Sequence, residues 1–360
     1  MSTLVKQHNF SAGPAILPQG VLKEAAQAIK NFNGMGLSIL EISHRSSQFE
    51  AVVNEAESLV REIAGLDDSY AVLFLSGGAS TQFFMAPMNL LNENETAAYI
   101  DTGSWSSKAI KEAKNFGHVE VLASSKDRNY AYIPKRYKKP EGAVYLHLTS
   151  NNTIFGSQYQ KFPDVDVPLV CDMSSDMFSR PFDVSKFGLV YAGAQKNLGP
   201  AGVTLVIVKK DWLGRVNRAI PSMLNYKTHV DNGSMYNTPP VFPIYVLMLT
   251  LRWIKAKGGL TGVEKMNKSK ARMLYKEIDS NPCFHGTVDT KDRSLMNVCF
   301  LPTKEEFTAP FLSMCKEAGI SGVKGHRSVG GFRASIYNAM PKKSVQVLVD
   351  VMRAFAKKHG

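Results

Sequence analysis

The stretch YAGAQKNLGPAG, residues 191–202, places one lysine between two apolar runs. The run before it, FGLVYAGA (187–194), and the run after it, VTLVIV (203–208), are both typical of buried strands. Lysine is rarely buried unless it is paired or takes part in chemistry. Lys196 therefore marks a candidate site at the end of a core strand, and the rest of the fold can be worked out from there.

Apolar runs alternate with amphipathic segments on both sides of this lysine. Strands are predicted over 70–76, 97–102, 119–124, 143–150, 168–175, 188–194 and 203–208. Helices are predicted between the early strands, over 80–91 and 106–116. Short apolar strands separated by helices favour an α/β fold with a mainly parallel, seven-stranded sheet covered on both faces.

A smaller α/β unit is predicted after the Gly258–Gly259 pair, which suits the end of a long helix over 242–257. Further helices are predicted over 262–280, 304–318 and 342–357, with strands over 295–301 and 332–338. The stretch 221–240 is rich in Asn, Gly, Ser and Pro and predicts an irregular loop. We expect a large domain over 16–258, a small C-terminal domain over 259–360, and a segment over 1–15 that packs with the small domain.

Composition and charge argue against a membrane-spanning, a secreted and a nucleic-acid-binding protein. The 360 residues contain no apolar stretch of transmembrane length and no apolar core of a signal peptide. The net charge is +12, but the lysines form no tract, so small acidic molecules suit the charge better than nucleic acid does. No two of the cysteines have C-x-x-C spacing; they are Cys171, Cys283, Cys299 and Cys315. We expect a cytoplasmic protein with reduced thiols and no metal, whose partners include neither a membrane nor nucleic acid.

Several polar groups follow predicted strands at the point where each strand ends. They are Gly77–Gly78, Trp105, residues 150–153, Asp172 and Lys196. Taken singly, each has an ordinary structural explanation, such as a helix cap, a turn or a lysine reaching for water. Because ligands of open parallel sheets bind at the carboxyl ends of the strands, the groups together predict one site.

Pyridoxal phosphate chemistry needs such a set of groups. A lysine amine bonds covalently to the cofactor, and a carboxylate keeps its ring nitrogen protonated. An aromatic side chain covers the ring, and backbone N–H groups at a helix N-terminus hold the phosphate. Lys196, Asp172, Trp105 and the Gly77–Gly78 pair could supply these four functions.

Long motifs give the sequence a family resemblance. They include SHRSSQF, FLSGGAS, HLTSNNTIFG, YAGAQKN and GHRSVGGFRASIYNAM, and they extend from His8 to the last helix. The chain resembles the phosphoserine aminotransferases, which are fold-type I pyridoxal phosphate enzymes of aminotransferase class V. The resemblance implies a homodimer with active sites shared across its interface.

The resemblance also implies roles for individual residues. Lys196 is the Schiff-base lysine, Asp172 contacts the ring nitrogen, Trp105 stacks on the ring and Thr153 approaches the ring hydroxyl. The cofactor phosphate is contacted by Gly78, Ala79 and Gln195 of one subunit and by Asn237 and Thr238 of the other.

The implied reaction exchanges an amino group between L-glutamate and 3-phosphohydroxypyruvate, giving 2-oxoglutarate and O-phospho-L-serine in serine biosynthesis. Activity on 4-phosphohydroxy-L-threonine, which pyridoxine biosynthesis uses, stays open. These substrates are small anions, and arginine binds carboxylate and phosphate through paired N–H groups. Arg333 is expected on the α-carboxylate, with His44–Arg45 and His326–Arg327 around the phosphate or side-chain carboxylate. The chain departs from some family members, because Ala79 stands where they carry an arginine after the glycine pair.

Other classes of protein remain as alternatives. A cysteine desulfurase needs a mobile cysteine, but Cys315 lies in a predicted helix and Cys283 follows a proline. An alanine–glyoxylate aminotransferase would leave the two His-Arg pairs without a purpose. A nicotinamide-dependent dehydrogenase should carry the G-x-G-x-x-G fingerprint, which is absent. A basic nucleic-acid-binding protein would be colourless, whereas a pyridoxal phosphate enzyme absorbs visible light.

Overall fold

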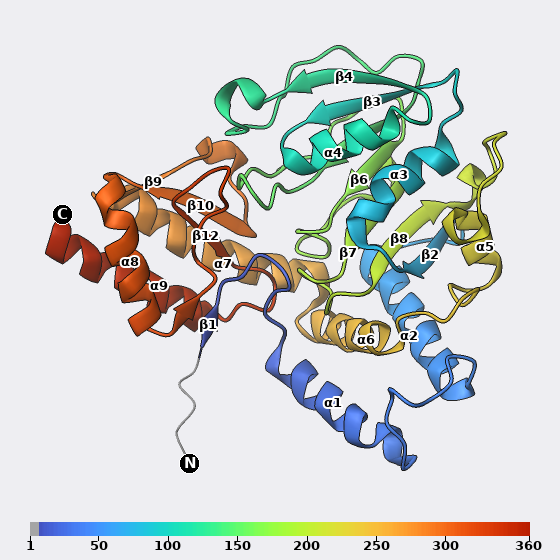
Figure 1. Cartoon of the computed structure of the whole chain (residues 1–360), viewed down its shortest axis with the longest axis horizontal. Helices are drawn as coiled ribbons and strands as arrows, with labels where there is room; N and C mark the ends of the chain where they lie inside the picture. Colours follow the sequence, from blue (N-terminus) through green and yellow to red (C-terminus); the bar gives the residue numbers. More distant parts are fainter. Residues whose placement is uncertain (1–6) are drawn as a thin grey trace.

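A seven-stranded sheet forms the centre of the structure, a computed structural model that describes residues 7–360 (Figure 1). Its strand order is β2-β8-β7-β6-β5-β3-β4. The strands are β2 (Tyr70–Leu75), β3 (Thr96–Asp101), β4 (His118–Ser124), β5 (Ala143–Thr149), β6 (Leu169–Asp172), β7 (Phe187–Gly193) and β8 (Thr204–Lys209). All seven predicted strands are therefore present, within a few residues of the expected bounds.

One strand breaks the parallel pattern. β8 runs antiparallel to both of its neighbours, β2 and β7, while β3 to β7 pair in parallel. Only residues 194–203 connect β7 to β8, and a parallel crossover needs a dozen residues or more. The short connection that carries Lys196 therefore forces the chain to turn back along β7.

Helices cover both faces of this sheet. On one face, α3 (Gly78–Leu90) and α4 (Ser104–Ala113) share an apolar core with alternate residues of the strands, such as Leu73 and Leu189. On the other face, α2 (Ser47–Ala64) and α6 (Val241–Ala256) pack on the intervening residues, such as Val72 and Val190. α1 (Gln19–Lys30) lies outside α6 (Figure 1).

A second, smaller α/β unit follows α6 along the chain. It has a three-stranded antiparallel sheet of β9 (Phe284–Gly286), β10 (Asn297–Pro302) and β12 (Phe332–Ser335). It also contains α7 (Gly259–Ser280), α8 (Thr308–Glu317) and α9 (Lys342–His359), which surround a separate core rich in phenylalanine.

The start of the described chain joins this second core. β1 (His8–Asn9) pairs in parallel with β11 (Ile320–Ser321), and Phe10 is fully buried in the same core. Of the segment 1–15 expected to pack here, residues 1–6 lie outside the described residues. The domain bounds at 15 and 258 stay predictions.

Three helices lie where none was predicted: α1, α2 and α5 (Tyr226–Asp231). The stretch 221–240 is therefore not wholly irregular, because the Asn225 side chain accepts a hydrogen bond from Lys227 N and begins α5. Within residues 7–360, no helix is both long and apolar enough to cross a membrane.

Candidate active site

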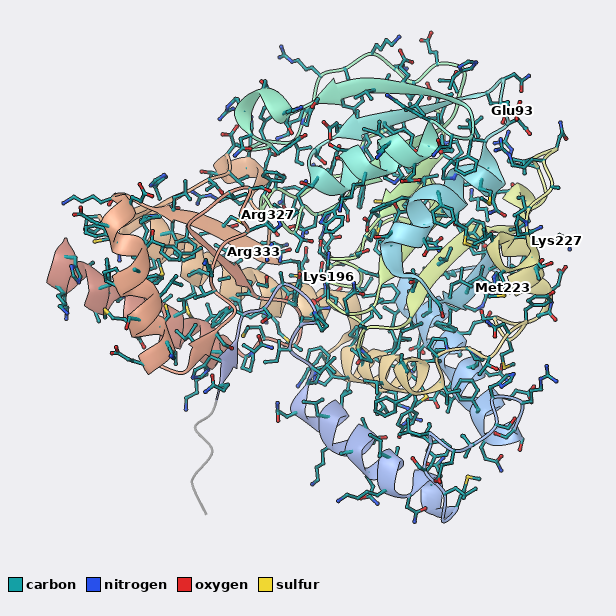
Figure 2. All side chains as sticks on the ribbon, viewed as in Figure 1. Glu93, Lys196, Met223, Lys227, Arg327 and Arg333 are labelled. Carbon is teal, nitrogen blue, oxygen red and sulfur yellow. The ribbon has the colours of Figure 1, made fainter. Side chains whose placement is uncertain are left out.

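The carboxyl ends of neighbouring strands bring the predicted residues together. Asp172 ends β6, Lys196 follows β7, Thr153 follows β5, and Trp105 lies in the first turn of α4, just after β3. Figure 2 shows Lys196 near the centre of the molecule, between the large sheet and β12, the strand that carries Arg333. The turn around Lys196 is held by the N–H groups of Leu198 and Gly199, which both donate to Ala194 O.

Lys196 is held by polar and aromatic neighbours. Its Nζ donates to Thr153 Oγ1 at 2.8 Å and lies 5.7 Å from the centroid of the Trp105 ring. Burial lowers the pKa of Lys196 to about 8, against the opposing effect of the Asp172 charge, and the Arg333 charge lowers it further. Near neutral pH the side chain can therefore both hold and release a proton.

Asp172 supplies a buried carboxyl group beside this lysine. The residue is 4% exposed, and its Oδ1 accepts a hydrogen bond from Ser174 N at 2.9 Å. Burial raises the pKa of Asp172, while the Lys196 charge and the Ser174 hydrogen bond act in the other direction. A buried carboxylate in this position is suited to accept a hydrogen bond from a cationic ring N–H.

The N-terminus of α3 forms the anion-binding end of the site. Its N-cap residue, Gly77, has φ of 97° and no side-chain cap, and the first turn of the helix holds no acidic residue. A Cβ atom at Gly77 would lie 1.9 Å from Thr81 Oγ1, so only glycine fits there. Backbone N–H groups of residues 78–80 are thus available to a phosphate.

Asn237 and Thr238 lie near this helix end in the same chain. They line a cavity of about 230 Å³ together with Gly77 and Thr81. Gln195 contacts Gly193, since a Cβ atom on Gly193 would lie 2.7 Å from Gln195 Oε1. Gly77 and Gln195 therefore follow the ends of β2 and β7, and Asn237 and Thr238 lie near the N-terminus of α3 in their own chain.

Arg333 and its neighbours form a cationic group on the other side of Lys196 (Figure 2). Arg333 Nη1 donates to Thr153 O at 3.1 Å, and its Nε is buried without a partner. Burial lowers the pKa of His326, and the charges of Arg333, Arg327 and Lys108 lower it further. Four basic residues thus share one region of the site.

Lys108 is a member of this group that the sequence did not reveal. It lies one turn after Trp105 in α4, with Nζ 4.5 Å from the centroid of the Trp105 ring. Among the described residues it forms no ion pair with an acidic side chain. In the sequence, the signal for Lys108 was its position three residues after Trp105, which places both on one face of a helix.

The structure does not bring His44 and Arg45 to Lys196 within one chain. They lie in the connection before α2, where Arg45 N donates to Ser43 Oγ at 3.1 Å. His44 Nε2 is buried and has no hydrogen-bond partner. This pair is therefore separate from the His326–Arg327 pair in the described chain.

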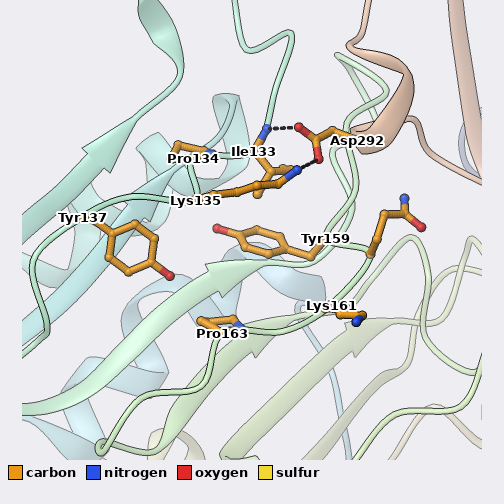
Figure 3. Close-up of a pocket in the computed structure, with 9 residues that line it drawn as sticks. Ile133, Pro134, Lys135, Tyr137, Tyr159, Lys161, Pro163 and Asp292 are labelled. Atoms are coloured by element: carbon orange, nitrogen blue, oxygen red, sulfur yellow. Dashed lines mark hydrogen bonds and ion pairs between the residues drawn. The ribbon is translucent and has the colours of Figure 1, made fainter.

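Another cavity, of about 370 Å³, lies apart from these residues (Figure 3). Its lining includes Tyr137, Tyr159 and Lys135, whose Nζ contacts Asp292 Oδ1 at 2.7 Å. Asp292 Oδ2 also accepts a hydrogen bond from Ile133 N at 3.1 Å. None of the predicted site residues lines this cavity.

Some buried polar atoms near Lys196 lack a hydrogen-bond partner. They are Thr102 Oγ1, Trp105 Nε1, Asn152 Oδ1 and Arg333 Nε, and other such atoms, for example the Tyr159 hydroxyl, lie elsewhere. Because buried polar groups are normally paired, these four atoms could pair with a polar ligand.

Comparisons with known proteins agree on one family. The model of the family described as "Aminotransferase class-V" matches residues 7–348. The curated phosphoserine aminotransferase of Flavobacterium johnsoniae is 61% identical over 355 residues, which cover 98% of this chain and all of that protein.

Two solved structures have the same fold. A phosphoserine aminotransferase from Bacillus circulans subsp. alkalophilus is 50% identical, with a TM-score of 0.96 and 99% of each chain covered. A phosphoserine aminotransferase from Trichomonas vaginalis, whose structure is described as PLP bound, is 39% identical, with a TM-score of 0.92, covering 97% of this chain and all of that one. The match over nearly the whole length, on top of the site geometry, shows that the chain belongs to the aminotransferase class-V family.

Proposed function

We propose that this chain uses pyridoxal phosphate to move an amino group from L-glutamate to 3-phosphohydroxypyruvate, giving 2-oxoglutarate and O-phospho-L-serine for serine biosynthesis. The observation that carries the proposal is the buried Lys196, whose amine lies between Thr153 and the Trp105 ring with Asp172 and Arg333 close by. The relatives that match over the full length bear the name of the same reaction.

The residues present fit pyridoxal phosphate on three grounds. An amine with a lowered pKa can attack an aldehyde, and Lys196 is such an amine. The uncapped N-terminus of α3 offers N–H groups to a phosphate. Trp105, whose ring centroid lies 5.7 Å from Lys196 Nζ, has a buried Nε1 without a hydrogen-bond partner that a polar ligand could accept from.

When bound, pyridoxal phosphate supplies an aldehyde that bonds to amines and a ring that accepts the electron pair left when a Cα proton departs. Asp172 would keep the ring nitrogen protonated, since its buried carboxylate could accept a hydrogen bond from that nitrogen. Trp105 would lie against the cofactor ring and exclude water from it. The Lys196 amine would take up the Cα proton of the substrate and give it back to the neighbouring carbon atom.

The substrate groups are assigned by charge. Arg333 would hold the α-carboxylate, because its guanidinium lies near Lys196 and has a buried, unpartnered Nε. His326, Arg327 and Lys108 would hold the phosphate or the glutamate side chain. The neighbouring cations depress the pKa of His326, and a phosphate dianion would oppose that effect and favour its protonation.

The chain would act as a homodimer with shared sites. Large apolar side chains are exposed along α1 and the connection that follows it: Leu22, Ile29, Met35, Leu37 and Leu40. Burial of such a patch favours a second copy of the chain as its partner. The same contact would carry Arg45 to the partner's site. Asn237 and Thr238 are proposed to complete the partner's phosphate contacts.

The proposed compartment is the cytoplasm. All four cysteines are free and buried, which suits a reducing environment.

The test is a direct assay of purified protein supplied with pyridoxal phosphate. Incubation with L-glutamate and 3-phosphohydroxypyruvate should yield equal amounts of 2-oxoglutarate and O-phosphoserine. Lys196→Ala should yield neither product, because the amine is lost. A separate assay with 4-phosphohydroxy-L-threonine would show whether the enzyme also accepts that substrate. Turnover with alanine and glyoxylate, but not with the phosphorylated substrate, would overturn the proposal.

A further inference from the structure

Five buried asparagines link segments that lie far apart in the sequence, where the large sheet meets the three-stranded sheet near Lys196. They are Asn151, Asn197, Asn267, Asn297 and Asn338, each 5% exposed or less. A buried amide is costly unless its donors and acceptor are paired, so the partners of these side chains define the contact between the two sheets. Nothing in the chemistry described above uses them.

Asn338 makes hydrogen bonds through both its side chain and its backbone. Its Nδ2 donates to Phe178 O at 3.0 Å, and its Oδ1 accepts from Asn267 Nδ2 at 2.8 Å. Its backbone N–H donates to Asn197 Oδ1 at 3.0 Å. Its carbonyl accepts from Lys270 Nζ at 3.3 Å. One residue of the C-terminal part thus contacts three different segments.

Asn197 connects this residue to the catalytic lysine. It directly follows Lys196, and its Nδ2 donates to Ser175 O at 3.1 Å while its Oδ1 accepts from Asn338 N. Because one planar amide makes both bonds, the turn that carries Lys196 cannot shift without breaking one of them.

The segment 173–179 is the common target of these bonds. It directly follows Asp172, and three of its carbonyls accept from asparagine amides: Ser175 O from Asn197, Phe178 O from Asn338, and Ser179 O from Asn267. Phe178 has φ of 54°, an uncommon conformation for a bulky residue. Such a conformation persists only when the surroundings impose it, and here the Asn338 amide binds the carbonyl of that residue.

A second branch reaches the strand that carries Arg333. Asn151 Nδ2 donates to Asn297 Oδ1 and to Ser175 Oγ, both at 2.8 Å. Asn297 Nδ2 donates in turn to Ser335 Oγ at 3.0 Å, two residues beyond Arg333 in β12. The segment after Asp172 is therefore tied both to the lysine turn and to β12.

We infer that Asn338, through the hydrogen bond from its side-chain amide to Phe178 O in segment 173–179, is a positioning residue that fixes the distance between Asp172 and Lys196. The inference rests on the proposed function, since it assigns to these amides the alignment of the groups that hold the ring and the amine. A misplacement of about 1 Å in such a group can reduce a rate about a hundredfold.

The experiment compares Asn338→Ala with a matched control in the holoenzyme. Asn281 is the control, because it is also a buried asparagine and lies remote from the site; its side chain makes three hydrogen bonds, to Glu277, Met352 and Cys283, against two for the Asn338 side chain. Asn338→Ala should lower kcat roughly ten- to a hundredfold and change KM for glutamate much less. Asn281→Ala should reduce stability but leave kcat near the wild-type value.

Amide hydrogen exchange supplies a readout that does not depend on activity. Exchange in segment 173–179, where Met177 N donates to Met173 O, should accelerate in Asn338→Ala and stay unchanged in Asn281→Ala. If Asn338→Ala does not fold, Asn267→Ala replaces it, since that change removes the bonds to Ser179 O and Asn338 Oδ1.

The outcomes separate the inference from the proposed function. An active wild-type enzyme with equal kcat in the Asn338 and Asn281 variants would overturn the inference alone. Faster exchange in 173–179 without loss of kcat would also overturn it. Absence of transamination by the wild-type enzyme would instead overturn the proposed function.

Discussion

Lys196 shows how burial sets the chemistry of a single residue. Burial disfavours its ammonium form and lowers its pKa to about 8, and the nearby Asp172 charge limits that shift. An ordinary lysine would be almost wholly protonated at neutral pH, whereas Lys196 supplies a useful fraction of free amine.

This pKa predicts how covalent capture of pyridoxal phosphate by the cofactor-free protein depends on pH. Only the unprotonated amine attacks an aldehyde, so below pH 8 the rate should fall about tenfold per pH unit. Above pH 8 most of Lys196 is already neutral, so the rate should level off. Stopped-flow absorbance measures this rate, and a rate still rising steeply from pH 9 to 10 would contradict the lowered pKa.

Lys108 provides a second prediction at this scale. Lys108→Ala should lower kcat/KM for O-phosphoserine about two- to fivefold, a modest effect because the charge is exposed to solvent. The effect on glutamate should be smaller, since the glutamate side chain carries less negative charge than a phosphate. The control is Arg333→Ala, which should impair both substrates alike because both carry an α-carboxylate. Equal losses with both substrates in Lys108→Ala would place Lys108 outside the distal site.

The sequence revealed Lys196 and Asp172 because each follows a continuous apolar run. Lys108 was not predictable in this way, since an exposed lysine on an amphipathic helix looks like any other solvated residue. The buried asparagines were hidden for another reason, because their partners lie far away in sequence, as Asn338 and Asn197 do.

At the scale of elements, the strands were the easiest to predict, because fully buried strands form continuous apolar runs. The direction of β8 was less evident, since it follows from the length of the loop before it rather than from its own residues. The missed α2 did carry helix-end signals: Ser46 Oγ accepts from Phe49 N at 3.3 Å, and Gly65 ends the helix with φ of 66°.

The N-terminus of α3 provides a prediction about one element. Gly77→Ala should weaken pyridoxal phosphate binding and lower the free energy of unfolding by at least about 1–2 kcal/mol, because φ of 97° disfavours alanine and Cβ would clash with Thr81. Gly65→Ala is the control, since it has φ of 66° but no atom within 4 Å of the new Cβ. It should lose stability and keep its affinity. Fluorescence titration with the cofactor measures both affinities, and unchanged binding in Gly77→Ala would exclude this helix end as the phosphate site.

At the scale of the whole molecule, the separation of Arg45 from Lys196 allows a complementation test. If the partner subunit supplies Arg45, a heterodimer of Lys196→Ala and Arg45→Ala chains has one site with both changes and one intact site. Random mixing should then restore about a quarter of the wild-type activity, because half of the dimers are mixed. The measurement uses co-expressed chains and compares them with each variant alone. No recovery would mean that Arg45 acts within its own chain or not at all.

The pairing of β1 with β11 also affects how the protein is made. His8 pairs with Ile320, and Gly13 lies against Lys196, since a Cβ atom at Gly13 would be 3.5 Å from Lys196 Cγ. A ribosome releases residues 8–13 long before it makes residues 320–321, so this early segment must wait for its strand partner. The wall it forms beside Lys196 is thus completed only after residues 320–321 have been made. Nascent chains and fragments that stop short of β11 are therefore expected to lack a closed catalytic centre, even after their large sheet has folded.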